Sequence, residues 1–113
     1  MSIWQTIGSL VILALGLAGT IAPIHIAKFV SIGPNGLTGI SEIRATYGGI
    51  FLGLGLTSLL TNGPSIAFAI GTGFACAAII RALSALFEQS RAPQNLGGIA
   101  FEGIIAALLL AGK

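Results

Sequence analysis

Apolar residues follow one another in four long stretches of this chain, at about residues 3–21, 43–60, 65–87 and 97–111. A helix rises about 1.5 Å per residue, so about 20 residues span the roughly 30 Å hydrocarbon core of a bilayer. The alternation of apolar and polar residues that a membrane β-strand shows is absent. We therefore predict an all-α fold: a single integral membrane domain over residues 1–113, a four-helix transmembrane bundle with up-down-up-down topology.

Residues that cap or interrupt helices separate the four stretches. The first ends before Pro23, and Pro64 suits the first turn of the third. Ser41 is a candidate cap for the second helix, with Glu42 in its first turn. The connection over residues 23–40 mixes apolar and polar residues, so we expect it to lie at the membrane interface.

Composition supports a chain that is solvated by lipid. Charged residues make up 7% of it, against about 25% in a soluble domain, and the mean hydropathy is +1.02. A cleaved signal peptide is the alternative interpretation of the first stretch, but no basic residue precedes Lys28. The net charge of +2 comes from few residues and forms no basic run, which argues against nucleic-acid binding.

Four charged residues in or beside the stretches are the candidate site: Glu42, Arg44, Arg81 and Glu102. A charge at the centre of a membrane helix costs about 2.5–3.5 kcal/mol, so such residues usually pair or serve a function. We expect Glu102 to contact Arg81 or Arg44, and Tyr47 lies one turn beyond Arg44. Two interpretations stay open: a neutral ion-pair network that ties helices together, or a polar pocket that binds an ion or a small head group.

Basic residues also predict an orientation. Lys28, Arg44, Arg81 and Arg91 fall on one face of the predicted bundle. Positive charge favours the cytoplasmic side, so both termini are expected outside.

Small residues recur about every four positions in three of the predicted helices, which predicts seams where helix backbones approach closely. We expect packing positions at Gly49, Gly53, Gly73, Ala77, Gly98 and Ala106.

One segment carries a resemblance to a known family. The run Ser41-Glu42-Ile43-Arg44-Ala45-Thr46-Tyr47-Gly48-Gly49, followed by Leu52-Gly53-Leu54-Gly55, resembles the signature of domain of unknown function 4345, a family of uncharacterised bacterial membrane proteins. Arg81-Ala82-Leu83-Ser84 and Glu102 are similar to its third and fourth spans. The resemblance implies a four-helix membrane fold and implies no activity. We expect the chain in a bacterial inner membrane.

Three functions fit this pattern. The first is a non-enzymatic accessory or scaffold subunit that packs with other membrane protein subunits in the lipid bilayer. The second is a small ion-coupled carrier in which Glu102 takes up and releases a proton. The third is a lipid- or quinone-binding membrane protein that uses a pocket with Arg44 and Arg81. No nucleophile with a base and an orienting acid is evident, and His25 and Cys76 each stand alone, so we predict no catalytic residues, no metal and no cofactor.

Overall fold

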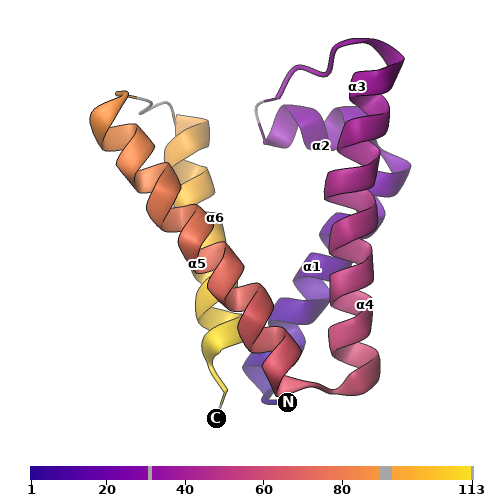
Figure 1. Ribbon diagram of the computed structural model, residues 1–113, viewed down its shortest axis with the longest axis vertical. Helices are drawn as coiled ribbons and strands as arrows, with labels where there is room; N and C mark the ends of the chain where they lie inside the picture. The colour runs from indigo at the N-terminus through magenta and orange to yellow at the C-terminus, as the bar shows by residue number, and fades with distance from the viewer. Residues whose placement is uncertain (31, 90–92, 113) are drawn as a thin grey trace. The chain divides into compact units, whose positions relative to one another are not determined.

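The computed structural model describes residues 1–30, 32–89 and 93–112. Its elements are α1 (Ile3–Ile21), α2 (Pro23–Phe29), α3 (Gly36–Ile43), the π-helix η1 (Arg44–Ile50), α4 (Phe51–Thr61), α5 (Pro64–Phe87) and α6 (Pro93–Leu110) (Figure 1). No strand forms among the described residues, so the all-α prediction is confirmed for them.

Four helices of the described chain are long and apolar enough to cross a membrane. They are α1 with 19 residues, the continuous helix Gly36–Thr61 with 26, α5 with 24 and α6 with 18. The second is continuous because α3, η1 and α4 follow one another without a break. These four helices correspond to the four apolar stretches of the sequence.

The helix bounds agree with the sequence in some places and differ in others. Pro64 lies in the first turn of α5, as predicted. The expected cap at Ser41 is wrong, because the helix already begins at Gly36, after the extended residue Asn35. The helix continues through the intervening residues, so Ser41 lies inside α3. Similarly, α6 starts at Pro93, a residue type that favours a first turn, rather than at residue 97.

Contacts divide the described chain into two compact units. The N-terminal unit comprises residues 9–62, which contain most of α1, then α2 and the helix Gly36–Thr61. The C-terminal unit comprises residues 1–8 and the described residues from 63 to 112, which contain the first turns of α1 together with α5 and α6.

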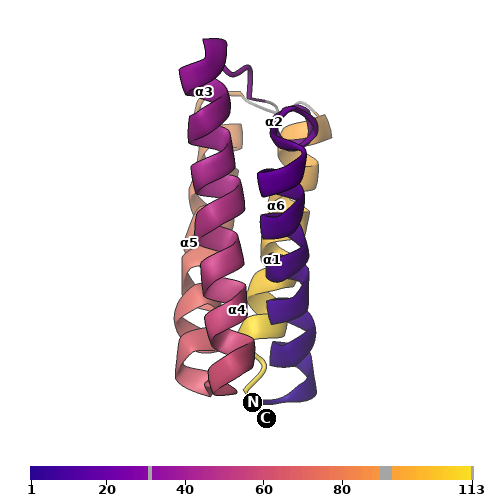
Figure 2. The same ribbon diagram turned by 90° about the vertical axis from the view of Figure 1, so that its right-hand side faces the viewer.

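In the N-terminal unit, α1 packs antiparallel against η1 and α4, which lie beside it in Figure 2. Near one end, the buried hydroxyls of Ser9 and Ser58 are 2.8 Å apart. Towards the other end, the backbone of Thr20 lies against Gly48. The helices approach closely because four of the facing positions are glycines: Gly16, Gly19, Gly48 and Gly55. A Cβ at Gly48 would lie 2.6 Å from the Thr20 hydroxyl oxygen, a distance that real side chains do not adopt.

In the C-terminal unit, α5 and α6 pack side by side and antiparallel. Gly71 of α5 faces Leu109 of α6, and a Cβ there would lie 2.9 Å from the Leu109 Cβ. The start of α1 closes the end of α6, where helix carbonyls lack partners. Gln5 Nε2 donates to the Leu109 carbonyl at 3.1 Å, and the Ser2 hydroxyl donates to the Ala111 carbonyl.

The close glycine contacts within the N-terminal unit lie at positions other than Gly49 and Gly53. A Cβ added at Gly49, Gly53 or Gly73 would meet nothing within 4 Å, so none of these three glycines packs closely within its own unit. Gly48 and Gly55 form the contact instead, because seven residues make about two helical turns and return to the same side. Each residue turns a helix by about 100°, so a glycine one or two positions away faces elsewhere.

Candidate functional site

Arg81 and Glu102 form an ion pair between α5 and α6 in the C-terminal unit. Arg81 Nε donates to Glu102 Oε1 at 2.7 Å, and Arg81 Nη2 donates to Oε2 at 3.2 Å. Both carboxylate oxygens are therefore bound by one guanidinium, in the two-pronged geometry that suits arginine. Asn95 adds a third contact, since its Oδ1 accepts from Arg81 Nη1 at 3.0 Å.

The α6 residues that meet Arg81 share one face of that helix. Asn95, Gly98 and Glu102 are spaced three and four residues apart, which places them on the same side. Gly98 is the small residue beneath the arginine side chain: a Cβ there would lie 3.1 Å from Arg81 Nε. A larger residue at position 98 would displace the guanidinium, so Gly98 is part of the site.

The pair is only partly accessible. The side chain of Glu102 is 15% exposed and that of Arg81 is 34% exposed. The two charges sum to zero, so each offsets the cost of placing the other in an apolar helix. Removing one partner would leave the other charge without compensation, which is the costly case for a buried pair.

Glu42 and Arg44 lie in the N-terminal unit, and the structure does not join them to each other. Arg44 Nε donates to the carbonyl of Thr20, near the end of α1, at 3.0 Å. Glu42 is exposed and makes no ion pair or hydrogen bond with another described residue. The two side chains are two positions apart on a helix, so they point about 200° away from each other.

Tyr47 is placed by aromatic packing. Its ring lies edge-on to the ring of Phe51, with the centroids 5.7 Å apart and the planes at 73°. Offset and edge-on arrangements of this kind are favourable for aromatic pairs. Tyr47 makes no hydrogen bond to Arg44 among the described residues of the N-terminal unit, and its role in a polar network stays a prediction.

The remaining predicted positions have mixed surroundings. Ala106 is 5% exposed in the core of the C-terminal unit, and Ala77 is half-buried. His25 and Cys76 are both exposed. Among the described residues, no group of three or more His, Cys, Asp or Glu side chains could hold a metal ion.

Several polar residues inside the apolar stretches have structural roles that the sequence analysis missed. Gln5, Ser9 and Ser58 are fully or almost fully buried, and each makes a hydrogen bond to a neighbouring helix. Their signal in the sequence was a polar side chain within an otherwise apolar run, which in membrane helices often marks an interhelical hydrogen bond.

No family model matches the chain, and comparisons with curated proteins and with solved structures find no match either. The fold and the Arg81–Glu102 pair are therefore the observations on which a function can be based.

Proposed function

We propose that this chain is a small, non-enzymatic integral membrane protein that acts as an accessory or scaffold subunit in a larger membrane complex. Buried residues make up a third or less of the most apolar window in each of its four candidate spans. On α5, for example, Phe68, Ile79 and Ile80 are each more than half exposed. Lipid and apolar protein surfaces are the environments that accept such side chains without cost.

The observation that carries the scaffold role is the closed Arg81–Glu102 pair. Both oxygens of the acid are bound by the guanidinium, so the two charges are used to hold α5 against α6. The Arg81–Glu102 pair is neutral and bonded within the chain, while the helices around it expose apolar side chains. This combination suits a protein that packs against other membrane proteins. The resemblance to domain of unknown function 4345 is consistent with this proposal, because that family is a four-helix membrane fold without an assigned activity.

The positive-inside rule supports an orientation with both termini outside a bacterial inner membrane and with residues 23–40 and 88–96 on the cytoplasmic side. The proposed up-down-up-down bundle would bring these two connections to the same face. It also places Lys28 and Arg44 on that face.

A carrier function is the second candidate, and it is favoured by one observation. Glu102 is an acid that lies mostly buried within a candidate span, and a proton-coupled carrier needs such a group. Its engagement with Arg81 argues for the scaffold instead, because a coupling acid must exchange its proton with water on each side in turn.

Photo-crosslinking in intact cells tests the scaffold proposal. A photoreactive residue at Ile80, which is 66% exposed, should give a discrete adduct with another membrane protein. The same residue at Ile105, which is 1% exposed, is the matched control and should give none. Adducts with lipid alone at Ile80, Leu83 and Phe68 would contradict the scaffold role.

Uptake of a substrate into liposomes under a proton gradient, abolished by Glu102→Gln, would establish the carrier instead.

A further inference from the structure

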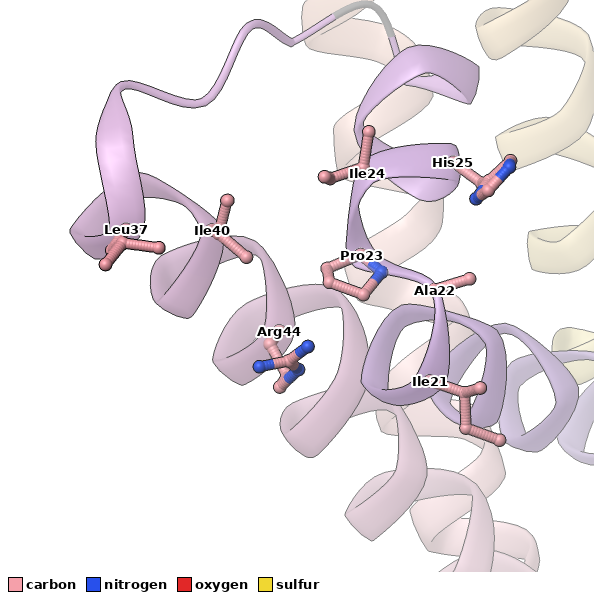
Figure 3. A pocket seen from close by; sticks show the side chains of 8 residues that line it. All are labelled: Ile21, Ala22, Pro23, Ile24, His25, Leu37, Ile40 and Arg44. Atoms are coloured by element: carbon pink, nitrogen blue, oxygen red, sulfur yellow. The ribbon is translucent and has the colours of Figure 1, made fainter.

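An open hollow lies in the N-terminal unit, between the end of α1, the helix α2 and the helix α3 (Figure 3). Its volume is about 520 Å³, which is room for more than one side chain. Four aliphatic residues give it apolar walls: Ile21, Ile24, Leu37 and Ile40. Figure 3 shows Ile24 on α2 and Ile40 on α3, with the guanidinium of Arg44 at the α1 side of the hollow.

Arg44 brings positive charge to one edge of this hollow. Its Nε donates to the Thr20 carbonyl at 3.0 Å, while its two terminal nitrogens have no partner among the described residues. The one acid between residues 21 and 44 is Glu42, which lies two positions from Arg44 and points about 200° away around the helix. The hollow therefore combines apolar walls with a cation that this acid does not neutralise.

The apolar walls lie on the aqueous side of Arg44 when the proposed spans cross the membrane. From Arg44 to Thr61 the helix rises about 26 Å, close to the roughly 30 Å hydrocarbon core, so the two residues come to opposite interfaces. Leu37 lies seven residues before Arg44 on the same helix, about 10 Å further from the core. The head-group layer is about 5–8 Å thick on each side, so the walls extend to water. An occupant of the hollow has to arrive from the aqueous side.

The helix α3 presents its part of the hollow in a regular pattern. Leu37, Ile40 and Arg44 are spaced three and four residues apart, so they lie on one face of the continuous helix. The helix α2 crosses the end of α1, which is seen end-on to α2 in Figure 2, and carries Ile24 on the facing wall. Amphipathic helices bind in apolar grooves through side chains at this same spacing.

We propose that the hollow binds an amphipathic, acidic helical segment of a partner protein on the aqueous side of the membrane. Two aliphatic side chains of that segment contact Leu37 and Ile40, and its carboxylate accepts hydrogen bonds from the terminal nitrogens of Arg44, whose planar guanidinium suits a carboxylate. Charge complementarity and the apolar walls together select this chemistry. The inference rests on the proposed scaffold role and names the kind of segment that the scaffold holds on its proposed cytoplasmic side.

The test is fluorescence anisotropy with the purified full chain in phosphatidylcholine nanodiscs, which have no net lipid charge. The probes are two fluorescein-labelled helical peptides that carry two leucines and one glutamate at the spacing of Leu37, Ile40 and Arg44, one in each direction. We expect one of them to bind nanodiscs that contain the chain and not to bind empty nanodiscs. The same peptide with lysine in place of glutamate should not bind the wild-type chain, and it should bind Arg44→Glu.

Substitutions in the chain separate the charge from the apolar walls. Arg44→Gln should weaken binding of the glutamate peptide about three- to fivefold, the effect of losing one exposed ion pair. Lys28→Gln is the matched control, because it removes the same charge from α2 outside the lining of the hollow, and it should change binding by less than about twofold. Leu37→Gln should weaken binding about fivefold. Leu60→Gln, at an exposed leucine near the other end of the same long helix, should leave it unchanged.

Four results would overturn the proposal. They are no binding of either glutamate peptide, equal binding of the glutamate and lysine peptides to the wild-type chain, equal loss in Arg44→Gln and Lys28→Gln, and unchanged binding in Leu37→Gln. Binding in detergent that is lost in nanodiscs would also contradict it, because lipid would then cover the hollow. If the Arg44 variants do not fold, as judged by helical circular dichroism, the lysine peptide and Leu37→Gln decide.

These measurements use the chain alone, whereas crosslinking at Ile80 reports on a membrane-spanning surface of α5. Failure of peptide binding would leave the Ile80 result standing, and failure of crosslinking at Ile80 would leave the peptide result standing. The two proposals can therefore fail separately.

Discussion

Loss of the arginine of the Arg81–Glu102 pair is the sharpest perturbation that the structure offers. Arg81→Leu would leave the Glu102 carboxylate, 15% exposed, next to a leucine on α5. Removing one partner of a fully buried pair costs about 3–5 kcal/mol. Because the Arg81 side chain is 34% exposed, the pair is only partly desolvated, and we expect a smaller loss of about 1–3 kcal/mol in the free energy of unfolding.

A double-mutant cycle isolates the pair from the individual side chains. Glu102→Leu alone would leave an uncompensated arginine and should also destabilise the protein. The double variant removes both charges and should recover much of the loss, because apolar replacements of a buried pair are often neutral or better. We expect a coupling energy of about 1–3 kcal/mol between the two positions.

The assay is unfolding of the purified chain in mixed micelles of increasing sodium dodecyl sulfate, followed by helical circular dichroism. Glu42→Gln is the matched control, because that acid is exposed and unpaired among the described residues, and it should shift stability by less than about 0.5 kcal/mol. If the losses in free energy of unfolding from Arg81→Leu and Glu102→Leu simply add in the double variant, the two side chains do not stabilise each other and the prediction is wrong. Arg91→Leu, at a position outside the described residues, should likewise cost less than Arg81→Leu.

Further predictions concern packing, membrane insertion and orientation. Gly48→Ala should lower the free energy of unfolding by about 1–3 kcal/mol, since its Cβ would overlap Thr20. Gly53→Ala should be neutral or stabilising by up to about 1 kcal/mol. Equal effects of the two variants in the micelle assay would disprove the close packing at Gly48. In native membranes Cys76, near the middle of α5, should resist a water-soluble maleimide and react after solubilisation; rapid labelling in intact membranes would place α5 outside the lipid. In a Cys76→Ser background, cysteines at Ser2 and at Lys113 should label from outside and one at Gln89 from inside, and the reverse pattern would overturn the proposed orientation.

The sequence determined the helices because their cause is local. A chain with 7% charged residues and four long apolar stretches has to satisfy its backbone polar groups within each stretch, and the α-helix does so without a partner. The end of α1 and the start of α5 followed from Pro23 and Pro64 for the same reason, since proline acts on its own turn. The sequence also predicted that Glu102 meets Arg81 or Arg44, because opposite charges in apolar helices tend to pair, and the structure shows the pair with Arg81.

The tertiary structure decided which side of each helix meets a neighbour. Glycines occur at 48, 49, 53 and 55 on the second long helix, and their spacing of four residues predicted packing at Gly49 and Gly53. The contact with α1 selects Gly48 and Gly55, because helix rotation depends on packing along the whole interface rather than on any one spacing.

The hydrogen-bond partner of Arg44 could not be predicted from the sequence either. Its acceptor is the carbonyl of Thr20, a backbone group near the end of a helix, and every residue type carries such a group. Residue types therefore could not identify it. Only the arrangement of α1 beside η1 brings that carbonyl within 3.0 Å of Arg44 and leaves the guanidinium facing an apolar hollow.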